Sequence, residues 1–241
     1  MPNIAFATAA SQKAANVWNT ATALADEGSY FQARNPTVGT VVATVTSIRD
    51  ATNTGANSAQ IQPTMIIYNP WPTADANAKT IYPQYLWTLL GQVPTSATTC
   101  NVGIWMEPNG SNCFSSLSTG FAITPTALNP GVSTQTRAKI WFGDLVATAT
   151  SSGGYLAGYR RLTSLIPVAS DEWLFTFGGV SSPTNLFSSS ATPARNRSTY
   201  SMAPLAIPPG YAMKLGFFAA ANGAAMSWEF ELGYAERVGG Q

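Results

Sequence analysis

Two acidic residues near the C-terminus, Glu229 and Glu231, are the nearest approach in this sequence to a catalytic carboxylate pair. Residues two apart on a strand share one face at about 7 Å, a spacing compatible with glycoside hydrolysis. The alternative is that both carboxylates only face solvent on the outer side of the last strand. We favour this alternative, because one strand rarely supplies both the acid and the nucleophile of such a site.

Histidine is absent from the chain, which removes most catalytic designs that work near neutral pH. A serine nucleophile would then need a lysine as its base, and no lysine carries a recognisable signature around it. Gly153 and Gly154 lack the lysine of a phosphate-binding loop. Two cysteines without histidine cannot complete a tetrahedral zinc site. The sequence therefore predicts a protein that is not an enzyme and binds no cofactor or metal.

Cys100 and Cys113 are the two cysteines of the chain. A disulfide between them would close a loop that contains residues 108–112, whose Pro, Asn, Gly and Ser residues are typical of a hairpin tip. Synthesis in a cytoplasm disfavours the bridge, although an oxidising medium could form it after release. Two unbridged, buried or half-buried thiols are the simpler interpretation.

Trp71 is the tryptophan with the most loop-like surroundings, because Pro70 and Pro72 flank it. It is a candidate for stacking on a sugar ring, and the alternative is packing under its own prolines or into a neighbouring subunit. Arg195 and Arg197 are candidates for contact with an acidic partner, or else are solvated loop charges. The tryptophans that fall within strand patterns are expected in the core: Trp87, Trp105, Trp141, Trp173 and Trp228.

Charge is scarce and balanced, with 12 Lys and Arg against 11 Asp and Glu. Charged residues make up 10% of the chain, whereas about 25% is typical of soluble domains. The chain has no basic arm or stripe, so we expect no direct contact with nucleic acid. It also has no apolar run long enough to span a membrane and no secretory signal, so we expect no membrane contact and synthesis in a cytoplasm. Surface of this kind is suited to burial in an oligomer.

Strand periodicity dominates the elements that must position these residues. In Met226–Tyr234 alternate residues are apolar, which predicts a half-buried antiparallel strand after the turn at Asn222–Gly223 and the Pro-Pro-Gly stop at 208–210. Further strands are expected at 40–49, 64–68, 84–90, 101–107, 138–146, 172–177 and 211–219. Long polar loops are expected at 115–135, 149–154 and 180–197.

The pattern lacks alternating strands and helices, so it predicts an all-β fold, an antiparallel β-sandwich of jelly-roll type. Residues 1–37 are expected to form an N-terminal arm or short helix, because Ala7–Asp26 is rich in alanine with apolar residues at roughly helical spacing. Residues 38–241 are expected to form a single β-sandwich domain. The arm would serve as an attachment segment that becomes ordered when it docks.

Short stretches at both ends of the chain support a resemblance. Pro2–Ser11, Leu24–Tyr30, Ile207–Tyr211 and Leu232–Glu236 are similar to the termini of small virion structural proteins of tailed bacteriophages. The middle of the chain carries no such similarity. The resemblance implies a β-sandwich on the exterior of the virion, as a head decoration, collar or fibre-like component.

The leading functional hypothesis is therefore a non-enzymatic virion protein, made in the host cytoplasm and located in the virion. Its expected partners are further copies of itself, with a trimer as the favoured homo-oligomer, and other virion proteins. Two alternatives stay open. One is a capsid shell protein with a single jelly roll, and the other is a carbohydrate-binding or receptor-binding module with Trp71 and the long loops at its contact.

Overall fold

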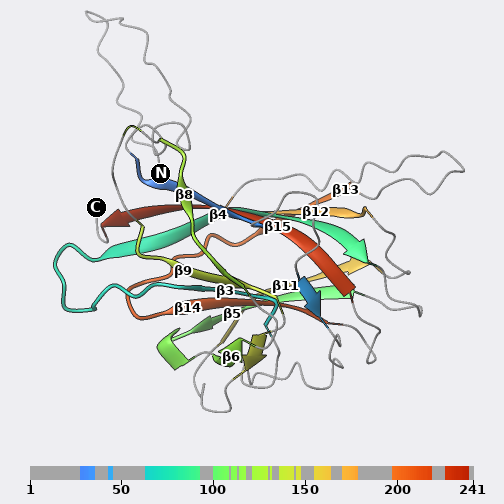
Figure 1. The fold of residues 1–241 in the computed structure, drawn as a ribbon, viewed down its shortest axis with the longest axis horizontal. Helices are drawn as coiled ribbons and strands as arrows, with labels where there is room; N and C mark the ends of the chain where they lie inside the picture. Colours follow the sequence, from blue (N-terminus) through green and yellow to red (C-terminus); the bar gives the residue numbers. More distant parts are fainter. Residues whose placement is uncertain are drawn as a thin grey trace, which may run out of the picture.

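Two β-sheets packed face to face make up the computed structural model of this chain, as the alternating sequence pattern predicts (Figure 1). The structure describes residues 28–35, 43–45, 63–92, 100–108, 110–112, 114–117, 121–129, 131, 136–143, 145–147, 155–163, 170–178, 197–218 and 226–238. No helix in these ranges is long and apolar enough to cross a membrane.

The first sheet has the strand order β13-β12-β4-β15-β1-β8, and β2 pairs with β15 as an additional strand. Its strands are β1 (Tyr30–Arg34), β2 (Ala43–Val45), β4 (Lys79–Gln92), β8 (Thr126–Ala127), β12 (Glu172–Phe177), β13 (Arg197–Met202) and β15 (Met226–Val238). The two longest strands, β4 and β15, run antiparallel along the centre of this sheet (Figure 1).

The second sheet has the strand order β11-β5-β14-β3-β9-β7. Its strands are β3 (Met65–Tyr68), β5 (Cys100–Glu107), β7 (Phe121–Ile123), β9 (Lys139–Phe142), β11 (Tyr155–Thr163) and β14 (Ala212–Phe218). A separate two-stranded sheet pairs β6 (Phe114–Leu117) with β10 (Leu145–Ala147), and the 3-10 helix η3 (Gly110–Asn112) precedes β6.

Pairing is antiparallel throughout both sheets except between β12 and β13, which are parallel. Parallel neighbours need a crossover connection, and the chain between these two strands is long enough to provide one. The all-β sandwich prediction is confirmed. The jelly-roll connectivity is not confirmed by this strand order.

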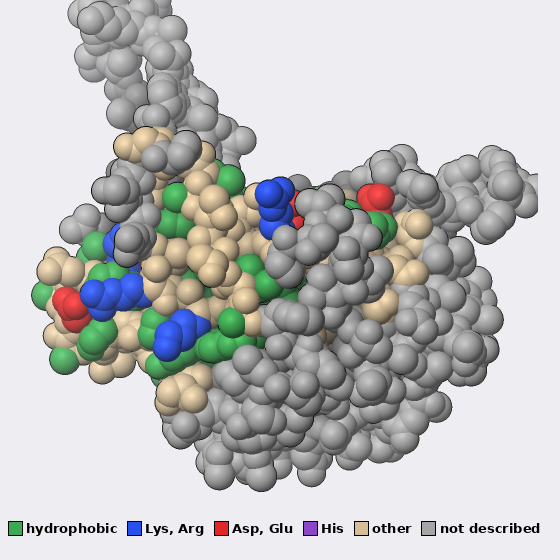
Figure 2. Space-filling view, in the orientation of Figure 1, with side chains coloured by type: hydrophobic (Ala, Val, Ile, Leu, Met, Phe, Trp, Pro, Cys, Tyr) green, Lys and Arg blue, Asp and Glu red, His purple; other side chains and the backbone are tan. Residues whose placement is uncertain are grey.

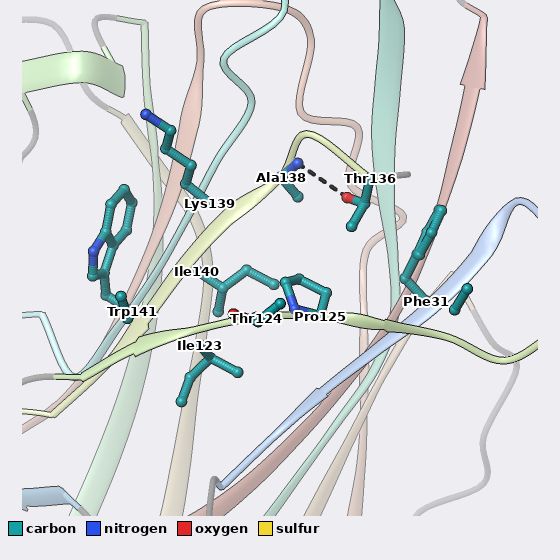
Figure 3. Close-up of a pocket in the computed structure, with 11 residues that line it drawn as sticks. Phe31, Ile123, Thr124, Pro125, Thr136, Ala138, Lys139, Ile140 and Trp141 are labelled. Atoms are coloured by element: carbon teal, nitrogen blue, oxygen red, sulfur yellow. Dashed lines mark hydrogen bonds between the residues drawn. The ribbon is translucent and has the colours of Figure 1, made fainter. Parts of the chain in front are cut away.

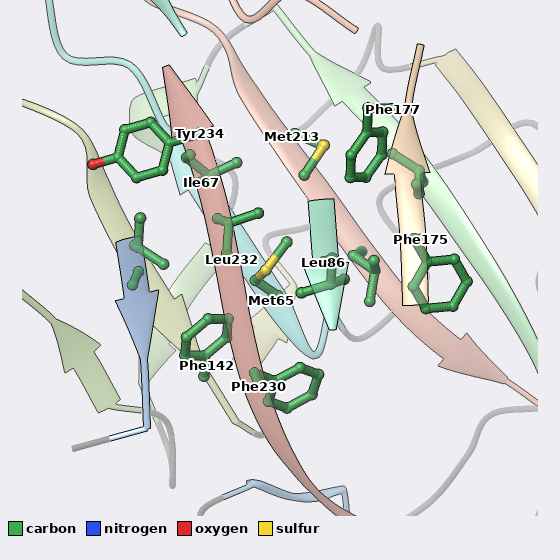
Figure 4. Close-up of a cluster of buried hydrophobic side chains, with 14 of the residues drawn as sticks. Met65, Ile67, Leu86, Phe142, Phe175, Phe177, Met213, Phe230, Leu232 and Tyr234 are labelled. Atoms are coloured by element: carbon green, nitrogen blue, oxygen red, sulfur yellow. The ribbon is translucent and has the colours of Figure 1, made fainter. Parts of the chain in front are cut away.

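The alternation in β15 has the predicted outcome. Trp228, Phe230 and Leu232 are buried against the second sheet, whereas Glu229 and Glu231 are half-buried on the other side. Figure 4 shows Phe230 and Leu232 of this row near Met65 and Phe142 of the facing sheet. The stacked rings of Phe142 and Phe230, 5.0 Å apart, join the two sheets at this point.

Several segments depart from the expected elements. The strand expected at 138–146 is interrupted after Phe142, because Gly143 has a φ of 118° and the chain leaves the second sheet there to form β10. The loop expected at 115–135 contains β7 and β8 and the end of β6. β1 lies within the predicted arm, so the first sheet extends into residues 1–37, and the rest of that arm up to residue 27 lies outside the described residues.

The two lateral sides of the sandwich differ. On one side the chain passes from β7 in the second sheet to β8 in the first, and Thr124 and Pro125 make the crossing. On the other side β11 and β13 end their sheets and lie close together. A Cβ on Gly158 of β11 would lie 2.8 Å from Cε of Met202 in β13.

The outer face of the second sheet is covered. Lys214 of β14 and Glu107 of β5 form an ion pair there, with 2.8 Å between Nζ and Oε1, and their side chains are only 2% and 1% exposed. Trp105 is buried on the same face with its ring over Gly103. This ion pair therefore holds charge on the face without presenting it to solvent, whereas Lys139 of β9, nearer the other edge of the sheet, is exposed.

Candidate functional site

The outer face of the first sheet brings chemically useful side chains into one row. In the strand register Arg34 lies opposite Glu231, Glu231 opposite Trp87, and Trp87 opposite Leu174. Cross-strand neighbours on one face have Cβ atoms about 4.5–5.5 Å apart, so these side chains are adjacent. Glu229 comes two residues before Glu231 in β15, so its side chain lies on the same face.

The pairing of β15 changes from β1 to β2 beside this row. β1 and β2 follow one another along the same edge of β15, and between them Asn35 takes over the pairing. Its backbone N–H donates to the Phe230 carbonyl at 3.2 Å, and its Oδ1 accepts from the Phe230 N–H at 2.9 Å. Asn35 therefore satisfies both backbone groups of Phe230, next to Arg34 in β1 and Glu229 in β15.

A hollow of about 200 Å³ lies at this position, lined by Arg34, Asn35, Trp87, Glu229, Phe230 and Glu231. A second hollow of about 400 Å³ shares Arg34 and Asn35 with it and extends to Gln32, Thr124 and Thr126. The shared residues make the two hollows neighbours along one edge of the sheet. We call the pair the outer groove.

The side chain of Tyr85 fixes one wall of this region. Its ring lies over Gly233, where a Cβ would approach Cε1 of the ring to 2.2 Å. Its hydroxyl donates to Oε1 of Glu231 at 2.7 Å and accepts from Nε2 of Gln32 at 3.2 Å. Burial, followed by the hydrogen bond to Glu231, raises the pKa of Tyr85 well above its usual value, so the phenol stays protonated and keeps donating.

Two charged side chains of the groove, Arg34 and Glu229, are placed to meet a ligand. Arg34 is exposed and Glu229 is half-buried, and neither has a hydrogen bond or ion pair within the described part of the chain. Unpaired groups of opposite charge that face one hollow are suited to hydrogen bonding with a bound polar molecule. The outer groove is therefore the best candidate site.

A larger pocket, of about 530 Å³, lies beneath the β7–β8 crossing. Figure 3 shows Phe31, Ile123, Pro125 and Ile140 around it, with Lys139 and Trp141 directed away from its centre. Its lining is mainly apolar, and Thr136 is its most engaged polar group. The Thr136 hydroxyl accepts from the Ala138 N–H at 3.0 Å.

The same hydroxyl joins Tyr234 and Glu236 behind this pocket. Thr136 Oγ1 lies 2.9 Å from the Tyr234 hydroxyl and donates to the Glu236 carboxylate. With both lone pairs and its proton in use, Thr136 has nothing left to offer a ligand. Burial raises the pKa of Glu236 above its usual value, while Thr136 and Lys79 act in the opposite direction.

Trp71 is held by its own chain. Asn69, fully buried, donates from Nδ2 to the carbonyls of Lys79 and Ile207 at 2.8 and 2.9 Å and accepts from the Trp71 N–H at 3.2 Å. The guanidinium of Arg137 lies over the Trp71 ring, 4.0 Å from its centroid. One face of the ring is thus occupied, which weakens Trp71 as a platform for a sugar.

The side chains of the other predicted site residues lie outside what the structure describes. Arg195 and Cys113 lie outside the described residues, and Arg197 and Cys100 are described only as backbone positions in β13 and β5. The disulfide between Cys100 and Cys113 stays a prediction. So does the acidic contact at Arg195 and Arg197.

Two of the tryptophans expected in the core are placed elsewhere. Trp87 is half-buried in the outer groove, and Trp141 is half-buried against Ile66 on the outer face of the second sheet. Trp105, Trp173 and Trp228 are buried as predicted. The parity of β4 could have revealed Trp87, because Leu86 and Leu90 define its inward face and Trp87 falls on the other.

Comparison with known protein families, with curated proteins and with solved structures finds no match. Within the described ranges no group of three or more Cys, Asp or Glu side chains lies close enough together to hold a metal ion. The candidate function therefore depends on the geometry of this chain alone.

Proposed function

We propose that this chain is a non-enzymatic structural protein of a virion, a capsid decoration or appendage component that works as an assembled homo-oligomer. Low surface charge supports the proposal. On the face shown in Figure 2 the Lys and Arg side chains of the described residues lie in small separate groups among uncharged residues. A surface with so few charges has little to lose by desolvation on contact with another subunit.

The observation that carries the proposal is an exposed apolar pair at the start of β11. Tyr155 and Leu156 are 59% and 46% exposed, and they project from opposite faces of a strand that ends its sheet. Register shifts after Leu156 and after Arg161 interrupt the pairing of β11 with β5, and such bulges discourage the addition of a further strand. The pair is therefore suited to side-chain packing against another subunit.

Measurement of the oligomeric state of the full chain, by light scattering and native mass, tests this proposal. The wild-type chain should form a homo-oligomer, with a trimer expected. In the double variant Tyr155→Ser/Leu156→Ser the dissociation constant of the oligomer should be at least tenfold higher. Leu128→Ser is the matched control, because Leu128 is 45% exposed beside β8, on the other side of the sandwich. A monomeric wild-type chain would contradict the proposal.

Attachment to other virion proteins is proposed to use residues 1–26. Deletion of this segment should abolish attachment to particles while the sandwich, followed by circular dichroism, stays folded. Attachment that survives the deletion would remove this part of the proposal. Closed shells formed by the purified chain alone would favour the alternative, a capsid shell protein.

A further inference from the structure

We propose that the outer groove is a binding site for a neutral saccharide, with Trp87 as the stacking surface and Arg34, Glu229 and Glu231 as the groups that bind hydroxyls. This function goes beyond assembly. It also uses a different surface from Tyr155 and Leu156, so either proposal can fail without the other.

The aromatic component comes from Trp87. Its indole is half-buried in the groove wall, so one part of the ring is held by packing while another part faces the hollow. Leu174 and Glu231 are its cross-strand neighbours, and they restrict the ring from both sides. A large, restrained apolar surface of this kind loses little entropy when a flat ligand packs on it.

The polar component is arranged around that ring. Glu231 has one carboxylate oxygen committed to Tyr85, which orients the other for a ligand. Glu229 and Arg34 have no described partner, so they supply a free acceptor and a free fork of donors. Each sugar hydroxyl can donate one hydrogen bond and accept others. The Glu229 carboxylate can accept from such a hydroxyl, and the Arg34 guanidinium can donate to it.

Charge selects among ligands that could stack on tryptophan. The two glutamates outnumber the single arginine, so the groove disfavours phosphates, sulfates and acidic sugars. Arg34 lies in both hollows of the outer groove, which places a positive charge where a cationic ligand would have to pass. A neutral ligand rich in hydroxyls meets neither obstacle.

The combined volume of the two hollows is large enough for more than one sugar ring. The hollows of about 200 and 400 Å³ share Arg34 and Asn35 in their linings, and the second adds the exposed Thr124 and Thr126 as further hydroxyls. The smaller hollow holds the tryptophan and both carboxylates. A short oligosaccharide would therefore place one ring on Trp87 and extend toward the β7–β8 crossing.

Calorimetric titration of the full chain with maltotriose, cellotriose and chitotriose tests the proposal. At least one of these neutral trisaccharides should bind, and Trp87→Ala should weaken that binding about tenfold or more, as expected for a central aromatic anchor. Arg34→Ala should also weaken it, and this variant removes only an exposed side chain, so it keeps the test valid if Trp87→Ala fails to fold. Binding should not decrease when a sulfated trisaccharide is present as competitor.

Two controls separate this site from other surfaces. Trp71→Ala removes the loop tryptophan that Arg137 covers, and Lys139→Ala removes an exposed cation beside the other pocket; neither should change the affinity. The proposal is overturned if all three neutral sugars fail to bind, if Trp71→Ala abolishes binding while Trp87→Ala does not, or if only the sulfated or a cationic trisaccharide binds.

Discussion

Two groups of charged residues on the outer faces of the two sheets differ in their surroundings. On the second sheet Lys214 and Glu107 are paired and almost completely buried, and Trp105 is packed beside them. On the first sheet Arg34 is exposed, Glu229 is half-buried, and neither has a partner within the described residues. A buried charge must be paired to be tolerated, whereas an open one is available for recognition. The comparison shows that the charges of the Lys214–Glu107 pair are structural, whereas those of Arg34 and Glu229 are accessible.

The largest effect should come from breaking the buried ion pair. Lys214→Ala leaves the Glu107 carboxylate buried beside no cation, so we expect the free energy of unfolding to fall by about 3–5 kcal/mol. Urea denaturation measures this loss. The double variant Lys214→Met/Glu107→Leu removes both charges and should recover most of it. A loss below about 1 kcal/mol for Lys214→Ala would show that the face is wetter than its burial indicates.

The two glycines under aromatic rings offer a matched pair of variants. A Cβ at Gly103 would lie 2.1 Å from the buried Trp105 ring, and a Cβ at Gly233 would lie 2.2 Å from the half-exposed Tyr85 ring. Overpacking costs about 1–3 kcal/mol, and we expect Gly103→Ala near the top of this range and Gly233→Ala near the bottom. Tyr85 can swing toward solvent, whereas Trp105 cannot. Equal losses in thermal denaturation would contradict this difference between the faces.

Glu236 is a second buried carboxylate, inside the sandwich. Its hydrogen-bond donor is the Thr136 hydroxyl, whereas Glu107 has the Lys214 ammonium as its partner. The raised pKa of Glu236 means that the folded protein holds the proton more tightly than the unfolded chain does. Stability from this group is therefore fully present below about pH 4.5, the ordinary value, and is lost as the pH rises through the higher folded-state pKa. Glu236→Gln should remove this pH dependence and stabilise the protein at neutral pH, as followed by denaturation across a pH series.

The smallest effect is expected at the tyrosine of the open face. Tyr85→Phe removes the hydroxyl that donates to Glu231 and accepts from Gln32, and a half-exposed hydrogen bond contributes about 0.5–1.5 kcal/mol. Thermal denaturation measures the loss, with Tyr155→Phe as a control on a tyrosine that is 59% exposed. A loss as large as that of Lys214→Ala would mean that the open face is as structural as the covered one.

Strands with long alternation were predictable, because side-chain parity alone decides which face is buried. β15 and β12 are examples, and the placement of Glu229 and Glu231 on an outer face follows from the same parity. Short strands were not predictable. β7 and β8 have three and two residues around Pro125, too few to show a period.

The candidate site was only partly predictable. The sequence indicates Glu229 and Glu231 as a pair, but its pattern predicts Trp87 in the core and does not mark Arg34, and the structure places all four around one hollow. Arg34 joins them because β1 pairs with β15 across almost the whole length of the sequence. Local patterns carry no information on such a pairing, nor on the role of Asn35 at the end of β1.

The central place of β15 has a consequence for biosynthesis. β15 follows all the other strands in sequence, yet it lies between β4 on one side and β1 and β2 on the other. During translation these strands therefore emerge without the neighbour that joins them, and their apolar faces wait for the last strand to arrive. A chain interrupted before Met226 would lack the strand that connects the halves of its first sheet, so only chains extending through β15 could form this subunit.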